Sequence, residues 1–354
     1  MGILINFRSY IYHIVIFLLV SIAVNGQPIV PALFIFGDSV VDVGNNNNLH
    51  TIVKSDFLPY GRDFSYHQPT GRFCNGKLAT DFTAETIGFT SYQPAYLSTE
   101  ATGENLLIGA NFASASSGYH ASTPKIYNTI PLSEQLEHYM DYQKKLELVA
   151  GQDNATLIIT QGIYLISAGS SDFLQNYYIN PLLYKLYSPE EFSHVLVQQF
   201  ADLVRKLYWL GARKVGVTSL PPLGCLPAAI TIFGEDSNDC VDHINKDAMT
   251  FNDMLNSTSE ELQSQLSNLT LVVFDIYQPL YQLVTKPEDN GFVEARKACC
   301  GTGVVETSYL CNSKSPGTCN NASEYVFWDG FHPSEATNRI LSDDLTAAAI
   351  SLIS

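Results

Sequence analysis

Five short apolar runs, separated by longer segments, constrain the fold of this chain more than any other feature of its sequence. Each has the length of a buried strand, and they span residues 32–36, 108–114, 163–169, 214–220 and 269–277. Apolar residues recur at helical spacing in three further segments, which are 196–207, 244–266 and 340–352. Buried strands that alternate with amphipathic helices indicate a parallel sheet covered by helices on both faces. We therefore expect an α/β protein.

Two long stretches, 40–77 and 286–326, show neither a strand-length apolar run nor a helical spacing of apolar residues. We expect them to be loops. No repeat, linker or low-complexity run divides the sequence. A length of 354 residues is long for one domain and short for three. We therefore expect residues 27–354 to form a single domain.

Residues 1–26 have the features of a signal peptide. Arg8 supplies a positive charge, and residues 11–24 form an apolar run that falls short of the roughly 20 residues needed to span a bilayer. Small residues precede Gln27, so we expect cleavage there. An uncleaved membrane anchor is the alternative, and no later segment approaches the length of a stable membrane span.

Four acceptor sequons for N-glycosylation agree with secretion. Their asparagines are Asn154, Asn256, Asn268 and Asn321. A lone sequon carries little information, but four that follow a signal peptide support one another.

The cysteines also favour an oxidising compartment. Six of the seven lie between Cys225 and Cys319, where disulfides are the expected use. A metal site is the alternative, but the spacing does not match that of zinc ligands. The sequence does not select the pairing. It leaves Cys74 as the odd cysteine, which is expected to be buried or a free thiol.

The charge of the chain excludes one broad class of partners. There are 19 basic and 35 acidic residues, and the formal net charge is −16. Nucleic acids and anionic membranes require a basic face, so neither is an expected partner.

Ser39 occupies a position where ligands bind in parallel sheets. It follows the first apolar run within the sequence Gly37-Asp38-Ser39. Ligands of open parallel sheets lie in the crevice beyond the carboxyl ends of the strands. Gly37 allows a sharp turn there, so the hydroxyl of Ser39 can project into the crevice. A simple turn or helix cap is the alternative interpretation of these residues.

A serine nucleophile needs a base, because its hydroxyl is hardly ionised at neutral pH. Of the eight histidines, His332 stands out because Asp329 precedes it by three residues in the sequence FWDGFHPS. One short loop can present both side chains. Asp329 would accept a hydrogen bond from Nδ1 of His332, which leaves Nε2 to take the proton of Ser39. A purely structural Asp–His pair at a helix start is the alternative.

Four segments in order resemble the plant GDSL esterase/lipase family of the SGNH hydrolases. They read FIFGDSVVDVGNNN, GANFASASSGY, SAGSSDF and VFWDGFHPSE. The resemblance implies a three-layer α/β/α sandwich around a mainly parallel five-stranded sheet. It implies Ser39 as nucleophile, with Asp329 and His332 completing the triad. It implies no metal or organic cofactor.

The resemblance also implies where the oxyanion donors lie. The family uses the backbone N–H of the nucleophile, here Ser39, and a glycine of the second segment. That glycine corresponds to Gly118, with Ser116 as the alternative. The family's third donor is an asparagine side chain, but this sequence has Ser171 in its place. A serine hydroxyl is shorter, so weaker activity or a different donor is expected. Asp42, Asn45 and Asn46 are expected to order the loop after Ser39.

We therefore expect a secreted, extracellular serine ester hydrolase of the apoplast or cell wall that forms an acyl-enzyme. Its substrates are expected to be small or polymeric carboxylic esters of lipid or cell-wall type. An acyltransferase with the same triad is one alternative. A catalytically weak glycan-binding or partner-binding wall protein, motivated by Ser171, is the other. The sequence names neither the acyl group, nor the alcohol, nor the oligomeric state.

Overall fold

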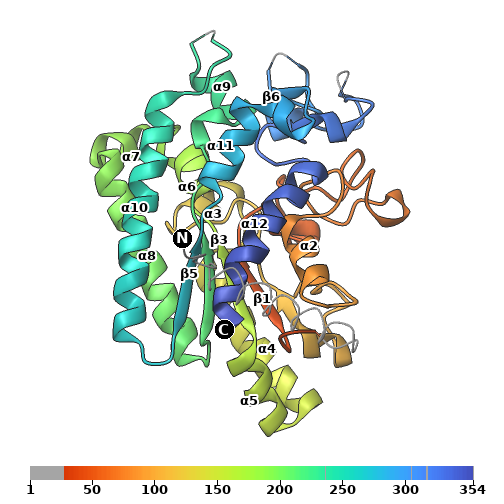
Figure 1. Cartoon of the computed structure of the whole chain (residues 1–354), viewed down its shortest axis with the longest axis vertical. Helices are drawn as coiled ribbons and strands as arrows, with labels where there is room; N and C mark the ends of the chain where they lie inside the picture. The colour runs from red at the N-terminus through yellow and green to blue at the C-terminus, as the bar shows by residue number, and fades with distance from the viewer. Residues whose placement is uncertain (1–27, 236, 304, 316–317, 354) are drawn as a thin grey trace, which may run out of the picture.

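A computed structural model describes residues 28–235, 237–303, 305–315 and 318–353. The expected signal peptide, residues 1–26, lies outside the described residues. The centre of the fold is a five-stranded sheet of β1 (Leu33–Gly37), β2 (Gly109–Asn111), β3 (Ile163–Ser167), β4 (Lys214–Thr218) and β5 (Thr270–Phe274) (Figure 1). The strand order is β2-β1-β3-β4-β5, and every pair is parallel. The prediction of an α/β fold around a parallel five-stranded sheet is confirmed.

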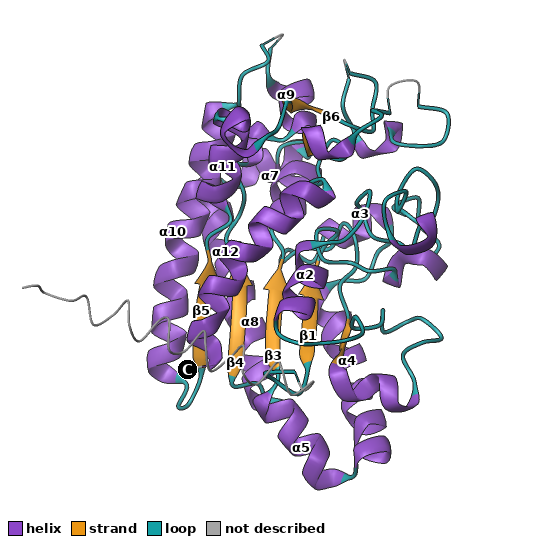
Figure 2. Ribbon diagram, turned by 45° about the vertical axis from the view of Figure 1, so that its right-hand side comes forward, coloured by secondary structure: helices purple, strands orange, loops and turns teal. Residues whose placement is uncertain are grey.

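Helices cover both faces of this sheet. The α-helices of the described residues are α2 (Ala79–Thr86), α3 (Thr123–Tyr127), α4 (Leu132–Ala150), α5 (Gln152–Gln161), α6 (Ser170–Asp172), α7 (Pro181–Leu186), α8 (Pro189–Trp209), α9 (Pro227–Phe233), α10 (Asp242–Gln265), α11 (Tyr277–Thr285) and α12 (Glu335–Ile353). Figure 2 shows β1, β3, β4 and β5 pointing to the same edge of the sheet. That edge carries the carboxyl ends, where parallel sheets bind ligands.

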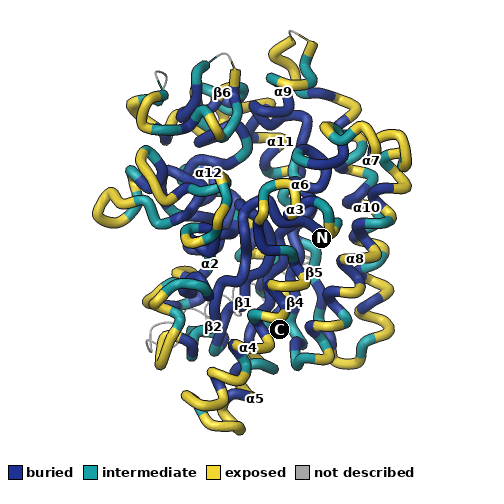
Figure 3. The backbone as a smooth tube through the Cα atoms, turned by 180° about the vertical axis from the view of Figure 1, so that it is seen from behind, coloured by how far each residue is buried: buried dark blue, intermediate teal, exposed yellow. Residues whose placement is uncertain are grey.

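The alternation of side chains along β1 shows how the layers are built. Phe34 and Phe36 point to the side where buried residues of α4, α8 and α10 pack. Leu33 and Ile35 point to the opposite side, into a second cluster with α2 and α12. Successive residues of a strand face opposite sides, so a strand buried on both faces is apolar throughout. Figure 3 shows this buried centre, with exposure confined to outer helix faces and loops.

The expected loop 286–326 contains a strand, which corrects the sequence analysis. β6 (Glu294–Ala298) pairs in parallel with β7 (Tyr325–Phe327) in a separate two-stranded sheet. The sequence of β6 is EARKA, which has charged residues and no run of β-branched or aromatic residues. Its pairing therefore depends on tertiary contacts that a local pattern does not reveal. The other expected loop, 40–77, holds only the short 3-10 turns Asn45–Asn48 and Ser65–His67.

The six clustered cysteines form the pairs that the sequence left open. They are Cys225–Cys240, Cys299–Cys319 and Cys300–Cys311. Two of these pairs tie together the irregular segment that follows β6. Cys74 is free and buried, and its burial raises the pKa of its thiol.

The surface of the fold bears on two further expectations. The four sequon asparagines Asn154, Asn256, Asn268 and Asn321 are all exposed. Within the described ranges, no helix combines the length and the apolar character that crossing a bilayer requires.

Candidate active site

The end of β1 is held by close backbone contacts. Gly37 has a φ of 140°, and a Cβ at this position would lie 1.9 Å from the carbonyl oxygen of Ser167. Gln135 of α4 accepts a hydrogen bond from the N–H of Gly37 and donates one to its carbonyl oxygen, both at 2.9 Å. These contacts admit only glycine, and they fix the point at which the chain leaves the sheet. Ser39 lies two residues further on.

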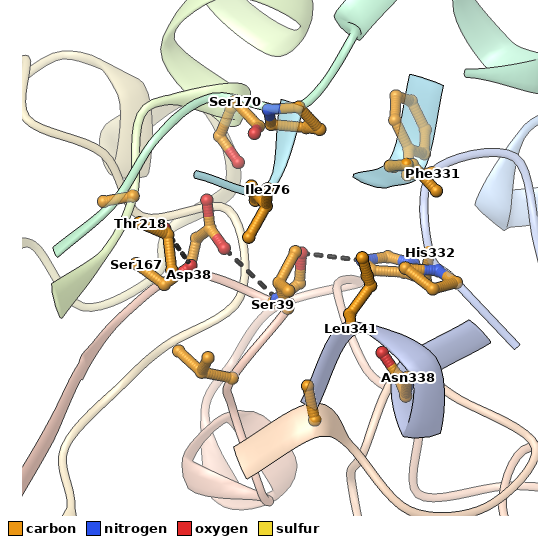
Figure 4. Close-up of a pocket in the computed structure, with 18 of the residues that line it drawn as sticks. Asp38, Ser39, Ser167, Ser170, Thr218, Ile276, Phe331, His332, Asn338 and Leu341 are labelled. Atoms are coloured by element: carbon orange, nitrogen blue, oxygen red, sulfur yellow. Dashed lines mark hydrogen bonds between the residues drawn. The ribbon is translucent and has the colours of Figure 1, made fainter. Parts of the chain in front are cut away.

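Ser39, His332 and Asp329 form a continuous chain of hydrogen bonds. Ser39 Oγ lies 2.7 Å from Nε2 of His332. On the other side of the ring, Nδ1 lies 2.7 and 2.8 Å from the two carboxylate oxygens of Asp329. All three side chains are buried. Figure 4 shows Ser39 and His332 facing each other, with Leu341 and Asn338 beside them.

A tight loop presents Asp329 and His332 together. The N–H of Trp328 donates to the carbonyl oxygen of His332 at 2.8 Å, which closes the loop. Oδ1 of Asp329 accepts the N–H groups of Phe331 and His332, both at 2.9 Å. The N–H of Cys300 donates to the carbonyl oxygen of Trp328 at 2.7 Å. The disulfide-bonded segment therefore supports the loop that carries the base.

Tyr60 completes the surroundings of Asp329. Its hydroxyl donates to Oδ2 of Asp329 at 2.7 Å, and both side chains are buried. Burial alone would raise the pKa of Asp329, but the charge of His332 and the hydrogen bonds from His332 and Tyr60 outweigh it and lower that pKa. Asp329 is therefore held as a carboxylate. The sequence analysis missed Tyr60, because it lies in a loop without a motif and 269 residues before its partner.

The loop after Ser39 is ordered by Asp42 and Asn45. Oδ1 of Asp42 accepts the N–H groups of Gly44 and Asn45 at 2.8 and 2.9 Å, and Oδ2 accepts that of Ala115 at 3.0 Å. Nδ2 of Asn45 donates to the carbonyl oxygens of Asn111 and Ala113 at 2.9 and 2.8 Å. These bonds join the loop after β1 to the segment after β2.

The two candidates for the second oxyanion donor, Gly118 and Ser116, have different surroundings. Gly118 packs against Asp172, where a Cβ would lie 2.3 Å from Oδ1. Ser116 instead lines a cavity together with Ser39 and has a φ of 60°, which is uncommon outside glycine. Among the described residues, no backbone group accepts the N–H of Ser39 or that of Ser116. Ser171 is buried and lines a second cavity that Ser39 also borders.

Two buried carboxyl groups have raised pKa values: Asp38, which precedes Ser39 in the sequence, and Asp172, which interacts with Asp38. Burial raises the pKa of Asp38 to about 7, although the N–H of Val40 donates to it. Burial likewise raises the pKa of Asp172 to about 7, against hydrogen bonds from Thr123, Tyr119 and His120. Water solvates a carboxylate better than the protein interior does, so burial favours the neutral acid.

Two cavities meet at Ser39. We call the first the apolar compartment, whose walls include Val41, Leu165, Leu226, Ile276, Leu341 and Leu345. We call the second the mixed compartment, whose walls include Lys54, Phe57, Tyr60, Tyr127, Ser308 and Tyr309. The two share four residues, which are Ser39, Gln175, Phe331 and His332. A group bound to Ser39 Oγ can therefore extend into both.

A parallel α/β sheet with a Ser-His-Asp chain at its carboxyl edge defines the class of serine hydrolases. Comparison with known proteins narrows the class. The sequence model described as GDSL-like Lipase/Acylhydrolase matches residues 33–345. The chain belongs to this family, and this membership makes it a hydrolase of carboxylic esters.

Relatives from Arabidopsis thaliana cover nearly the full length. The protein named GDSL esterase/lipase At5g22810 is 62% identical over 340 residues, which is 95% of this chain and 94% of that protein. The protein named GDSL esterase/lipase APG is 58% identical over 326 residues, which is 92% of each. A solved α/β hydrolase, LAE5 from the metagenome of Lake Arreo in Spain, aligns with 91% of this chain and 96% of its own. Its identity of 11% and TM-score of 0.41 are too low to bear on function.

Proposed function

We propose that the protein is a secreted serine esterase that works through Ser39, His332 and Asp329 and a covalent acyl-enzyme. The observation that carries the proposal is the 2.7 Å contact between Ser39 Oγ and Nε2 of His332, whose Nδ1 contacts Asp329. This geometry lets the imidazole accept the proton of the hydroxyl as Oγ attacks an ester carbonyl.

The steps follow from these contacts. Oγ bonds to the carbonyl carbon, and its proton moves to Nε2 of His332. The C–O bond to the alcohol then breaks, and the imidazolium returns the proton to the leaving oxygen. Water, deprotonated by His332, attacks the acyl-enzyme, and Ser39 recovers its proton as the acid leaves. Asp329 stabilises the imidazolium in both halves.

The negative charge that develops on the carbonyl oxygen needs hydrogen-bond donors. The N–H groups of Ser39 and Ser116 are candidates, because no described backbone group accepts either one. Of the donors expected from the sequence, Gly118 lies against Asp172, and Ser171 borders the apolar compartment. We assign the second backbone contact to Ser116.

Covalent labelling tests the acyl-enzyme. An alkyl organophosphonate with a good leaving group should react once per molecule, and mass spectrometry should place the adduct on the peptide that contains Ser39. The Ser39→Ala variant, folded and glycosylated like the wild type, is the control. An unlabelled wild type, or an adduct on another residue, contradicts the proposal.

Secretion is part of the same proposal. It is supported by the leader-like residues 1–26, by the four exposed sequons and by the three disulfides. Expression of the full chain in plant cells should deliver a protein to the medium that begins near Gln27. Its electrophoretic mobility should increase after enzymatic removal of N-glycans. A full-length protein retained in the cell would contradict secretion.

A further inference from the structure

The two compartments beside Ser39 differ in the chemistry of their walls. Aliphatic side chains dominate the walls of the apolar compartment. The mixed compartment is lined by Lys54, Ser308 and several aromatic residues, and Nζ of Lys54 donates to the carbonyl oxygen of Asn47 at 2.8 Å.

The apolar compartment adjoins a further cavity, which we call the deep cavity. Its walls include Leu33, Ile87, Ile163, Phe274 and Ala349. Thr80, Leu165 and Leu345 line both the apolar compartment and the deep cavity, and we call these three residues the neck.

The path through the neck follows one face of β3 under α12. Ser167, Leu165 and Ile163 point to the same face because they alternate along the strand, and the distance from the first to the last is about 13 Å. An extended chain of this length would contain roughly ten C–C bonds.

We propose that the apolar compartment and the deep cavity hold the acyl chain of the substrate, while the mixed compartment holds its alcohol. The substrate class is then an ester of an apolar carboxylic acid with a polar alcohol. This assignment rests on the proposed esterase function. Burial of each methylene group favours binding by about 0.8 kcal/mol.

The order of the chemical steps supports this orientation. The alcohol leaves first, and water must then reach the acyl-enzyme. The compartment that empties and fills with water therefore suits polar walls, such as Lys54 and Ser308. The acyl chain stays bound through both steps, which suits the apolar compartment.

The experiment is a chain-length series of nitrophenyl esters from acetate to palmitate. For the wild type, kcat/KM should rise by up to about fourfold for each added methylene until the deep cavity is filled, and then level off. Leu345→Trp should block the neck, so the rise in kcat/KM should stop at a shorter chain than in the wild type. Ala347→Trp, on the exposed side of the same helix, is the matched control.

Ala349→Leu fills the deep cavity more gently and keeps the test available if Leu345→Trp does not fold. It should shorten the longest preferred chain. An unchanged chain-length profile in both folded variants overturns the assignment. A second series, of acetate esters with alkyl alcohols of increasing length, tests the opposite orientation. If these variants shorten the longest preferred alcohol, the apolar compartment holds the alcohol and the assignment is overturned. A wild type that hydrolyses none of these esters would instead contradict the esterase function itself.

A second inference rests on a different observation, the unpaired amide of Gln175. This residue lines both compartments together with Ser39 and His332. Its Oε1 is buried without a hydrogen-bond partner, and its amide pairs with none of the described residues. Buried amides are normally hydrogen-bonded, so an unpaired one beside a nucleophile indicates a group that a ligand completes.

The backbone around Gln175 is also unusual. Residues Phe173–Tyr177 form a single π-helical turn directly after α6. Such turns are rare and occur often at functional sites. Gln175 follows Ser171 by four residues on this helical segment, so both side chains lie on the side that borders the apolar compartment. The side chain of Gln175 is longer than that of Ser171, so its amide extends further from the backbone than the serine hydroxyl does.

We infer that the side-chain amide of Gln175 donates a hydrogen bond to the carbonyl oxygen as it becomes an oxyanion. Rotation of the amide by half a turn exchanges the positions of Oε1 and Nε2. The N–H group can therefore occupy the place that Oε1 has in this structure. Gln175 would thus provide the third donor, next to the N–H groups of Ser39 and Ser116. This assignment also rests on the proposed esterase function.

Gln175→Met keeps the size of the side chain and removes the donor. It should lower kcat by about 10²-fold to 10³-fold with little change in KM, because the bond forms in the transition state. The affinity for an alkylboronic acid, which becomes a tetrahedral anion on Ser39, should fall by a similar factor. Gln198→Met, an exposed glutamine on α8, is the matched control.

Ser171→Ala separates the two side-chain candidates. It should change kcat by less than about threefold if Gln175 is the donor. A large loss in Ser171→Ala with little loss in Gln175→Met overturns the inference and returns the role to the serine hydroxyl. A Gln175→Met variant that binds substrate more weakly at unchanged kcat also overturns it. A wild-type protein that hydrolyses no ester would contradict the proposed esterase function itself, independently of the role of Gln175.

Discussion

The apolar and mixed compartments share four residues, yet they are built from different kinds of structure. The apolar compartment takes its walls from regular elements, such as Leu165 of β3 and Leu341 of α12. The mixed compartment takes its walls from irregular segments, with Lys54 from 40–77 and Tyr309 from 286–326. Packed elements are rigid, whereas loops vary and move more readily. The fold therefore fixes the acyl side, and the loops define the alcohol side.

The largest expected effect concerns Ser39, whose side chain lines both compartments. Ser39→Ala should lower kcat by on the order of 10⁶-fold for every ester, whatever its acyl chain or alcohol. The thermal unfolding midpoint should stay close to that of the wild type, since only one hydroxyl at the end of a strand is removed. Residual activity within about tenfold of the wild type would remove Ser39 from the nucleophile role.

The second effect concerns Asp329, which Tyr60 joins to the wall of the mixed compartment. Asp329→Asn should lower kcat by about 10⁴-fold, because the amide favours the wrong tautomer of His332. Steady-state kinetics with a short activated ester measures the change. A raised KM at constant kcat would make Asp329 a binding residue, and another carboxylate would have to be sought.

The third effect is a pH dependence that originates in the wall of the apolar compartment. Burial raises the pKa of Asp38 from 3.8 to about 7. The unfolded chain therefore releases this proton at lower pH than the folded protein. Asp38 contributes stability that is complete below about pH 4 and is lost as the pH rises through about 7.

Chemical denaturation at about pH 5 and about pH 8 measures this contribution, which is on the order of a few kcal/mol. The free energy of unfolding should be larger at the lower pH. In Asp38→Asn the difference between the two pH values should be smaller, because the amide does not titrate. If the free energy of unfolding changes equally between the two pH values in the variant and in the wild type, groups other than Asp38 cause the pH dependence.

The fourth effect tests the support of the mixed compartment. Replacing Cys300 and Cys311 together by serine removes the disulfide that braces the segment around Ser308 and Tyr309. We expect a loss of about 2 to 3 kcal/mol in the free energy of unfolding. Preference among alcohols should weaken, while the preferred acyl chain length should stay the same. A changed chain-length profile with an unchanged alcohol preference would contradict the division between the two compartments.

The smallest effect concerns the neck of the apolar compartment. The hydroxyl of Thr80 is buried without a hydrogen-bond partner. Thr80→Val keeps the shape and removes the unpaired group, so the free energy of unfolding should rise by about 1 kcal/mol. Hydrolysis of plain acyl esters should be unchanged or slightly faster. A destabilised variant would indicate that the hydroxyl has a partner, such as a bound water.

The regular half of the molecule was predictable because its signals are local. The run that became β1, the helical stripe of α8 and the spacing of Asp329 and His332 each lie within a short stretch of sequence. Local patterns do not report which distant segments meet. The strand β6, with the sequence EARKA, the hydrogen bond from Tyr60 to Asp329 and the pairing of the cysteines were therefore not foreseen.

The sequence by itself determined the class of fold and pointed to Ser39, Asp329 and His332 as the proposed reacting groups, because apolar runs and short motifs each lie within one stretch of the chain. The tertiary structure decided that Gly118 packs against Asp172 and that Ser116 lines a cavity with Ser39, since both depend on how the loop after β2 packs. It also decided that Gln175 reaches the site and that two compartments meet there. Cavities are formed by side chains from many elements, so no single stretch of sequence encodes them.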